Sequence, residues 1–250
     1  MFLHDEVLMI SVITICKNEA AHIAQTIESV IGQSYSDVEY IVIDGGSTDG
    51  TVDIIKSYSD KISYFVSEPD NGIYDALNKG ILAAHGEIIG TMNGGDFYEP
   101  GALQAVWNSF LEKPDSNILY GNLNFIYDDG TSENFIAGDD LSRLPYGSIN
   151  LGHVACFVTA DTYIEQGLYN TAYKIAGDYD FLLRCYVNGK KFYHIRNTLS
   201  NYRVNGVSST NHVLTFQETC AIALVYASDE AMRCEIREGI SNLYKERFLS

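Results

Sequence analysis

The sequence has few cysteines, and no two of them stand at a metal-binding or redox spacing. Its five cysteines are scattered over 250 residues, and no Cys-x-x-Cys pair occurs. This argues against a zinc site built on paired cysteines, and an odd number of distant thiols suggests no disulfide framework. We therefore expect reduced thiols and a cytoplasmic protein.

Basic residues are also scarce. Lys and Arg number 16 against 33 Asp and Glu, which gives a formal net charge of −17. Nucleic-acid binding needs clustered Lys and Arg, so no nucleic-acid partner is expected. A nucleoside diphosphate could still bind, because salt screens charge repulsion beyond about 8 Å.

Long apolar runs are missing as well. No stretch approaches the roughly 20 apolar residues of a membrane-spanning helix. Residues 1–6 (MFLHDE) are too short and too acidic for a signal peptide. The sequence leaves open whether the protein touches the inner face of the membrane.

Apolar, β-branched stretches alternate with helical patterns in the first hundred residues. Four strands are predicted, over residues 9–16, 39–44, 62–67 and 87–92. Helices are predicted between them, over residues 19–31, 51–58 and 73–85. Strands that are apolar on both faces are typical of parallel sheets covered by helices. The pattern predicts an α/β fold with a doubly wound, mostly parallel sheet and helices on both faces.

The second half of the chain is less regular. We expect helices over residues 102–111 and 176–187, strands over 117–127 and 190–195, and a polar loop over 131–152. From residue 211 to the end the pattern is helical. The chain thus divides into one domain, residues 1–210, and a C-terminal helical tail, residues 211–250.

Polar clusters follow three of the predicted strands, at residues 16–19, 44–50 and 93–96. Ligands of open α/β sheets bind beyond the carboxyl ends of the strands. The three clusters therefore predict one binding site at that edge of the sheet.

Four ordered segments carry a family resemblance: residues 11–19 (SVITICKNE), 42–51 (VIDGGSTDGT), 67–80 (SEPDNGIYDALNKG) and 176–184 (AGDYDFLLR). Together they resemble the inverting, GT-A type family 2 glycosyltransferases, and most closely bacterial enzymes of exopolysaccharide and colanic acid biosynthesis. The resemblance covers roughly residues 8–210. It implies a nucleotide-sugar-binding half, residues 1–99, and an acceptor and catalytic half, residues 100–210.

Asp44 is the residue we expect to contact the base of the nucleotide. A carboxylate at a strand end accepts hydrogen bonds only, so it can take an N–H of uracil or guanine. The alternative is an Asx-turn, since Asp and Gly are common turn residues. Glu19 resembles the family's acidic residue near the nucleotide; its alternative role is a favourable charge at a helix N-terminus.

The turn Asn93-Gly94-Gly95-Asp96 stands where the family carries its metal-binding Asp-x-Asp motif. The resemblance implies Mg²⁺ or Mn²⁺ bound through Asp96, bridging diphosphate oxygens and neutralising the leaving group. Only one carboxylate remains at this turn. Glycines there would let the backbone approach the phosphates.

Asp178 is the candidate catalytic base, since inverting transfer needs a carboxylate to take the proton of the acceptor hydroxyl. The family's Glu-Asp pair reads Gly177-Asp178 here. Asp180 is the alternative base, and a plain helix N-cap is the alternative role of Asp178.

The remaining donor contacts are implied by the resemblance or by position in these segments. His153 stands where related enzymes carry a histidine. Arg203 stands in a segment from which an arginine could clamp the diphosphate. Asp75 and Lys79 could equally form a surface i,i+4 pair. The full set of expected donor contacts is Thr14, Cys16, Asn18, Glu19, Asp44, Gly45, Ser47, Asp70, Gly72, Asp75, Asn78, Lys79, Asn93, Gly94, Gly95, His153 and Arg203.

The resemblance implies an inverting glycosyltransferase that moves a sugar from a UDP or GDP donor to a glycan or lipid-linked oligosaccharide in cell-surface polysaccharide biosynthesis. The alternative is a noncatalytic nucleotide-sugar or carbohydrate-binding module, suggested by the departures at Gly94-Gly95 and Gly177. A nicotinamide-dependent oxidoreductase is disfavoured because no Gly-x-Gly-x-x-Gly follows the first strand. We expect acceptor choice to lie in residues 121–151 and in the tail, which could also pair two subunits into a homodimer.

Overall fold

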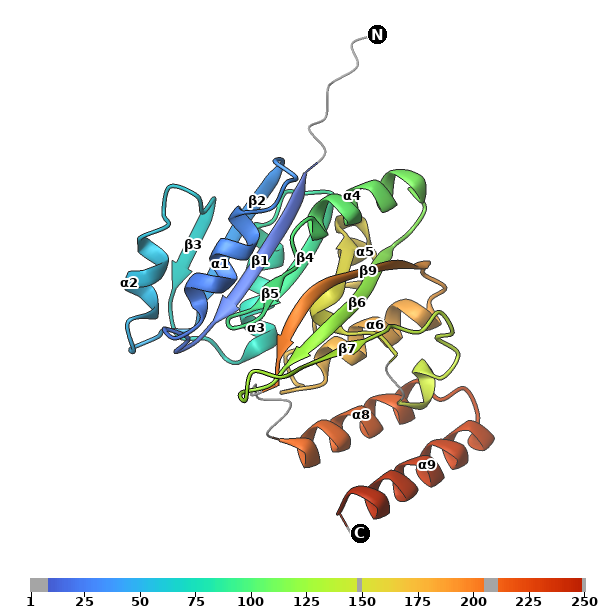
Figure 1. The fold of residues 1–250 in the computed structure, drawn as a ribbon. Coiled ribbons are helices and arrows are strands. Elements are labelled where there is room, and N and C mark those ends of the chain that lie inside the picture. The colour runs from blue at the N-terminus through green and yellow to red at the C-terminus, as the bar shows by residue number, and fades with distance from the viewer. Residues whose placement is uncertain (1–8, 148–149, 205–210, 249–250) are drawn as a thin grey trace.

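The first half of the chain is a parallel α/β unit, as predicted (Figure 1). The computed structural model describes residues 9–147, 150–204 and 211–248, and for residues 240–248 the backbone alone. The strands are β1 (Ile10–Cys16), β2 (Val38–Asp44), β3 (Tyr64–Ser67) and β4 (Ile88–Asn93). The helices between them are α1 (Ile23–Ile31), α2 (Thr51–Lys56) and α3 (Ile73–Ala83). Residues 1–6, which we do not expect to form a signal peptide, lie outside the described residues.

The second half extends the same sheet. Its strands are β5 (Phe97–Tyr98), β6 (Ile118–Ile126), β7 (Ser132–Phe135), β8 (Cys156–Thr159) and β9 (Phe192–Arg203). Its helices are α4 (Ala102–Glu112), α5 (Ala160–Gln166), α6 (Gly177–Val187), α8 (His212–Tyr226) and α9 (Glu230–Phe248), with short 3₁₀ turns at Leu144–Tyr146 and His153–Ala155.

Within the described residues the sheet has nine strands, in the order β3-β2-β1-β4-β8-β6-β9-β5, with β7 paired to β6. The pairs β1–β2, β1–β4 and β2–β3 are parallel, and so is β6–β9. Antiparallel pairs occur where β8 joins β4 and β6, and at the short strands β5 and β7. The doubly wound α/β architecture is thus confirmed, and its antiparallel pairs all involve strands of the second half.

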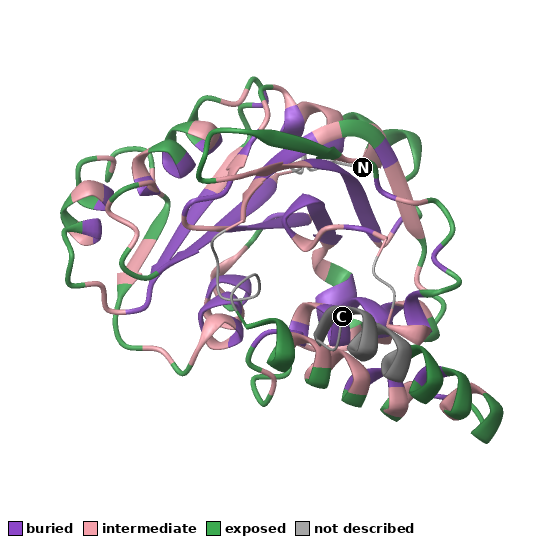
Figure 2. Cartoon of the chain, turned by 60° about the horizontal axis from the view of Figure 1, so that its bottom comes forward, coloured by how far each residue is buried: buried purple, intermediate pink, exposed green. Residues whose placement is uncertain are grey.

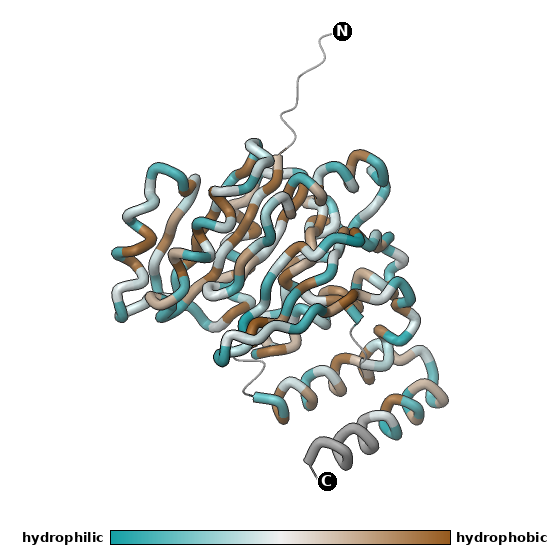
Figure 3. The backbone as a smooth tube through the Cα atoms, in the orientation of Figure 1, coloured by the Kyte–Doolittle hydropathy of each residue, from teal (hydrophilic) through white to brown (hydrophobic). Residues whose placement is uncertain are grey.

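The core lies on both faces of the sheet, because successive side chains of a buried strand point to opposite sides. In β1, Val12 packs into the cluster that contains Ile23 and Ile27 of α1. Its neighbour Ile13 packs into the other cluster, with Leu77 of α3. Figure 2 shows the central strands buried and the outer helix surfaces exposed, and Figure 3 shows apolar residues concentrated along the central strands. Within the described residues, no helix combines the length and apolar character needed to cross a bilayer.

Two predictions of secondary structure were wrong in extent. The loop predicted over residues 131–152 contains β7, which follows a turn closed by hydrogen bonds between Tyr127 and Thr131 and between Gly130 and Tyr127. Its residues are mostly exposed, so no apolar alternation marks it in the sequence. The strand predicted over residues 190–195 continues as β9 to Arg203 and carries the buried Leu199.

The C-terminal tail is a pair of helices, as predicted. α8 packs against α6, burying Ile222 beside Tyr179 and Leu183. α9 packs back on α8 through Ile236 and Ala227. The domain boundary predicted at residue 210 lies outside the described residues.

Candidate active site

A cavity of about 940 Å³ opens beyond the carboxyl ends of β1 and β4. Strand pairing sets Cys16 of β1 opposite Asp44 of β2, and Ile15 opposite Asn93 of β4, which brings the polar clusters together. The expected site residues that line the cavity are Cys16, Asn18, Glu19, Asp70, Gly72, Asn93, Gly94, Asp96, His153, Asp178 and Arg203.

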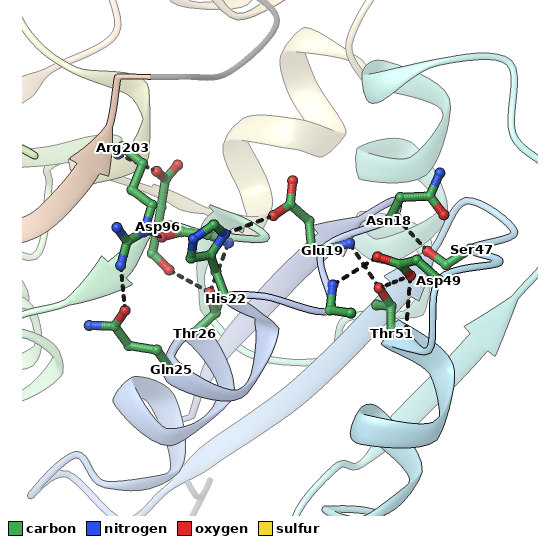
Figure 4. Close-up of polar contacts among 12 residues, drawn as sticks. Asn18, Glu19, His22, Gln25, Thr26, Ser47, Asp49, Thr51, Asp96 and Arg203 are labelled. Carbon is green, nitrogen blue, oxygen red and sulfur yellow. Dashed lines mark hydrogen bonds and ion pairs between the residues drawn. The ribbon is translucent and has the colours of Figure 1, made fainter. Parts of the chain in front are cut away.

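The loop after β1 is held in place by the loop after β2 (Figure 4). The backbone N–H of Asn18 donates to Ser47 Oγ at 2.7 Å, and Asn18 Oδ1 accepts from the N–H of Thr48 at 2.9 Å. The N–H of Glu19 donates to Thr51 Oγ1 at 2.8 Å. Asn18 has a φ of 56°, an unusual backbone conformation that these bonds stabilise. Ser47 therefore positions this loop and does not itself line the cavity.

Asp44 is fully buried and is not among the residues that line the cavity. Its carboxylate accepts hydrogen bonds from the N–H groups of Gly46 and Ser47, from both serine hydroxyls Ser47 and Ser67, and from the Cys16 thiol. Burial would raise the pKa of Asp44, but these donors hold it below its ordinary value. The structure thus gives Asp44 the Asx-turn role that stood as its alternative, and its contact with a base stays a prediction.

Asp70 occupies the space beside Gly45. A β-carbon at Gly45 would collide with Asp70 Oδ2, so a larger residue there would have to displace this carboxylate from its place at the cavity wall. Asp70 Oδ1 accepts from the N–H of Gly72 at 3.0 Å. The glycine at position 45 therefore serves the placement of Asp70.

The turn at residues 93–96 is fixed from two sides. Thr26 of α1 donates to the Asp96 carbonyl at 2.7 Å and accepts from the Gly95 N–H at 3.0 Å. Asp96 Oδ1 accepts from the backbone N–H of Arg203 at 2.9 Å, and Oδ2 accepts from Asn93 Nδ2 at 3.0 Å. Burial raises the pKa of Asp96 to about 7, with the charge of Glu19 adding to the effect and the two donors opposing it.

Glu19 lies directly over this turn. A β-carbon at Gly94 would stand 2.8 Å from Cys16 Cβ and 2.9 Å from Glu19 Cγ. Burial raises the pKa of Glu19, against the effect of His22, whose Nδ1 is 3.5 Å from Glu19 Oε2. Gly94 therefore leaves room for the side chains of Cys16 and Glu19 beside this turn.

Arg203, at the end of β9, reaches across the turn. Its Nε donates to the Gly95 carbonyl at 2.9 Å and its Nη2 donates to Gln25 Oε1 at 2.6 Å (Figure 4). The side chain is half-buried and lines the cavity. This brings a guanidinium to the wall that carries Asp96, where a diphosphate is expected.

Asp178 and Asp180 point to different surroundings although they are two residues apart on α6. Asp178 lines the cavity, and its Oδ1 lies 3.1 Å from the hydroxyl of Tyr74. Asp180 is buried beside Arg184 at 3.7 Å and Tyr226 at 3.3 Å, and burial raises its pKa. Of the two, only Asp178 lines the cavity.

The second departure, Gly177, is explained by Tyr74. A β-carbon at Gly177 would stand 2.8–2.9 Å from three atoms of the Tyr74 ring. The Tyr74 hydroxyl donates to the Ile175 carbonyl and contacts Asp178. A glutamate at residue 177 would displace the ring that contacts the candidate base.

His153 is half-buried at the cavity wall and joins a network of hydroxyl groups. Its Nε2 lies 2.9 Å from the Tyr169 hydroxyl, which lies 3.1 Å from that of Tyr163. Burial lowers the pKa of His153, against the opposing charge of Asp178, so its ring is neutral at neutral pH.

The other expected contacts lie behind the cavity wall or away from it. Asn78 makes two hydrogen bonds to the backbone of Tyr169, of 2.9 and 3.0 Å. Lys79 pairs with Glu68 at 2.8 Å and with Asp75 at 3.6 Å, which matches the surface-pair alternative. The residues of this set that do not line the cavity are Thr14, Asp44, Gly45, Ser47, Asp75, Asn78, Lys79, Gly95 and Asp180.

Sequence reasoning missed several residues of the cavity. Tyr74 lies inside the segment 67–80 that carries the resemblance, but spacing alone gave no reason to choose one tyrosine among 18. Lys17, next to the expected Cys16 and Asn18, also lines the cavity. Thr215 and Thr219 of α8 do so as well, and no pattern in the tail marks them.

Two acidic side chains that could serve as ligands of a divalent cation lie on one wall of the cavity. Among the residues that the structure describes, no three His, Cys, Asp or Glu side chains are grouped so that they could hold a metal ion. Asp96 and Glu19 nevertheless bring two carboxylates to one wall, close enough for the charge of Glu19 to raise the pKa of Asp96. Mg²⁺ commonly takes one or two protein carboxylates and completes its shell with phosphate oxygens and water.

Comparison with known proteins gives a family match over the first half of the chain. The family described as "Glycosyl transferase family 2" matches residues 11–145. A PGL/p-HBAD biosynthesis glycosyltransferase of Mycobacterium bovis is 32% identical over 186 residues, which covers 72% of this chain and 70% of the relative.

Solved structures share the fold at low sequence identity. Staphylococcus aureus TarS 1-349 in complex with UDP-GlcNAc superposes with a TM-score of 0.71 at 15% identity, over 96% of this chain and 73% of that one. In a longer TarS crystal structure the chain spans only 44% of the length. The mannosyltransferase PcManGT from Pyrobaculum calidifontis in complex with GDP-Man and Mn²⁺ superposes with a TM-score of 0.64 at 15% identity, over 95% of this chain and 75% of that one.

Proposed function

The chain belongs to glycosyl transferase family 2 and is a transferase enzyme, and we propose that it moves a sugar from a nucleoside diphosphate donor to a hydroxyl group of a glycan or lipid-linked acceptor, with inversion at the anomeric carbon. One observation carries this proposal. The Asp178 carboxylate lines the same cavity as the turn of Asp96 and the Arg203 side chain.

Asp178 is the base of the proposed reaction. The acceptor oxygen forms a bond to the anomeric carbon while the bond from that carbon to the diphosphate oxygen breaks, and Asp178 takes the acceptor proton. The diphosphate leaves with the bonding electron pair as the free nucleoside diphosphate. The Tyr74 hydroxyl, 3.1 Å from Asp178 Oδ1, would help to orient this carboxylate in the cavity.

The diphosphate is proposed to lie at the wall formed by Asp96, Glu19 and Arg203. A solved neighbour that carries UDP-GlcNAc and another that carries GDP-Man support a nucleotide-sugar donor of the UDP or GDP type. Asp96, with Glu19, would hold Mg²⁺ or Mn²⁺, and the cation would neutralise charge on the leaving group. The Arg203 guanidinium contributes further positive charge at this wall.

The noncatalytic alternative rested on the departures at Gly94 and Gly177. Both have a packing reason here, because Gly94 leaves space for Glu19 and Gly177 leaves space for Tyr74. Local packing therefore accounts for both departures, without a loss of catalysis being needed to explain them.

The test is donor turnover by the purified full chain. We would incubate it with labelled UDP- and GDP-sugars, with Mg²⁺, Mn²⁺ or EDTA, and measure released nucleoside diphosphate. We expect release with one nucleotide class, lost in Asp178→Asn while nucleotide binding persists. Absence of release with every donor, in folded protein that binds the nucleotide, would overturn the proposal.

A further inference from the structure

Glu218 of α8 binds the loop that leads into α6. Its Oε1 accepts from the N–H of Lys174 at 2.8 Å, and its Oε2 accepts from the N–H groups of Ile175 and Ala176, both at 2.9 Å. One carboxylate thus binds three consecutive backbone N–H groups. Charge-assisted bonds of this kind are stronger than neutral ones, so they fix the loop firmly.

This loop leads directly into the helix that carries the candidate base Asp178. Ala176 is the N-cap of α6 and makes no side-chain cap, and Asp178 lies in the first turn of that helix. The side chain that satisfies the backbone here comes from a helix about 40 residues later in the sequence. Glu218 therefore fixes the backbone that leads into α6, by binding the N–H groups of the N-cap residue and of the two residues before it.

Ile175 connects Glu218 to Asp178. Its N–H donates to Glu218, and its carbonyl accepts from the hydroxyl of Tyr74, which also lies 3.1 Å from Asp178 Oδ1. A hydroxyl has one proton, so the two acceptors compete for it. The Ile175 carbonyl shares its peptide group with the Ala176 N–H, which Glu218 binds. The position of this peptide therefore decides how much of the Tyr74 hydrogen bond Asp178 receives, and with it how the Asp178 carboxylate is held.

α8 is docked firmly enough to impose this position. Ile222 is fully buried between Tyr179 and Leu183 of α6, and Tyr226 donates to Asp180 Oδ1 at 3.3 Å. On the same helix Thr215 and Thr219 line the cavity. The tail thus forms part of the active-site wall, besides contributing Glu218.

We propose that Glu218 is a positioning residue for Asp178, acting through Ile175 and Tyr74. This inference rests on the proposed role of Asp178 as the base. It makes α8 necessary for full turnover, and it separates the role of Glu218 from donor binding, because the hydrogen bonds of Glu218 go to residues 174–176 and not to the turn at residues 93–96 or to Arg203.

The experiment compares Glu218→Gln and Glu218→Asp with the wild type in the full chain, below the unfolding transition of each. Gln keeps the shape but places an NH₂ group opposite a backbone N–H, so we expect kcat to fall about 10- to 100-fold, as displacements near 1 Å can cause. The KM for the donor and the affinity for the nucleoside diphosphate should stay within about twofold, since binding and positioning are separate. Asp keeps the charge on a shorter side chain and should recover part of kcat.

Glu235→Gln is the matched control. Glu235 is another carboxylate of the tail, exposed and paired with Arg143 at 2.7 Å, and its loss should leave kcat unchanged. Tyr74→Phe combined with Glu218→Gln should cost little more than either change alone, because both act on one connection.

A wild-type kcat in Glu218→Gln, with Asp178→Asn inactive, would overturn the role of Glu218 and leave the proposed function standing. A loss of turnover in Glu218→Gln that is explained by unfolding alone, with normal kcat per folded molecule, would also overturn the positioning role of Glu218. Absence of turnover in the wild type would instead contradict the proposed function itself.

Discussion

The ring of Tyr74 lies against the backbone of Gly177, where a β-carbon would stand 2.8 Å from the nearest ring atom. Tyr74 is 4% exposed and its hydroxyl is bound to the Ile175 carbonyl, so it cannot move aside freely. The contact links α3, in the first half of the chain, to the first turn of α6. It explains why glycine precedes the candidate base, and it leads to the first prediction.

Gly177→Ala should push Tyr74 away from Asp178. We expect unfolding free energy to fall by about 1–3 kcal/mol, as for other overpacked sites, and kcat to fall about 10-fold or more. Urea unfolding and steady-state kinetics measure the two effects. The control is Gly239→Ala in α9, where nothing lies within 4 Å of an added β-carbon; it should stabilise by about 0.5–1 kcal/mol. Equal changes of unfolding free energy and kcat in the two variants would contradict the contact between Tyr74 and Gly177.

Asp178→Asn should remove the proton acceptor without removing the donor site. We expect turnover to fall about 100- to 10,000-fold, the range for loss of a general base. Nucleotide affinity, measured by calorimetry, should change little. Asp180→Asn is the comparison: it breaks the pair with Arg184 and the contact from Tyr226, so it should lower the melting temperature and retain most of the turnover. A reversed pattern would make Asp180 the base.

Asp96→Asn should change how stability depends on pH. Burial raises the pKa of Asp96 from 3.8 to about 7, so the folded state holds its proton more tightly than the unfolded chain. The stability that protonated Asp96 contributes to the fold is therefore fully present below about pH 4 and is lost as pH rises to about 7. This loss is on the order of 4 kcal/mol at most.

The measurement is urea unfolding of both proteins at pH 5, 6, 7 and 8, without nucleotide or metal. The stability of Asp96→Asn relative to the wild type should increase with pH and level off above pH 7. Asp60→Asn, at an exposed position, should show no such trend. Metal-dependent nucleotide binding should also be lost in Asp96→Asn. A flat difference across this range would mean that Asp96 is not held in its protonated form.

Asp44→Asn should mainly destabilise the fold. Its carboxylate accepts five hydrogen bonds inside the protein, so replacing one oxygen by an NH₂ group should cost about 1–3 kcal/mol at pH 7. Because these bonds lower the pKa of Asp44, the cost should persist above about pH 4 and shrink as pH falls through the folded pKa. Denaturation at pH 7 and pH 3 checks this. A selective loss of one nucleotide base, with stability unchanged, would instead support the predicted base contact.

The general architecture could be predicted from the sequence because it depends on local patterns. The apolar run of β1 indicates a strand that is buried on both faces. The helical spacing of Ile73, Leu77 and Ile81 indicates the side of α3 that faces the core. Polar clusters at the ends of β1, β2 and β4 then had to meet, because parallel strands place these ends at one edge. The polar strand β7 could not be found this way, since an exposed edge strand buries too little apolar surface to leave a pattern.

The sequence by itself therefore determined the α/β fold, the edge of the sheet that carries the site, and a short set of candidate carboxylates. Only the tertiary structure separated Asp178, which lines the cavity, from Asp180, which faces Arg184, and turned Asp44 inward to its own turn. It also brought Tyr74 to Asp178 and Glu218 to Ala176, across 104 and 42 residues of chain. The physical reason is that the local spacing of apolar residues indicates which side chains are buried. Which residue a side chain contacts depends instead on how distant elements pack.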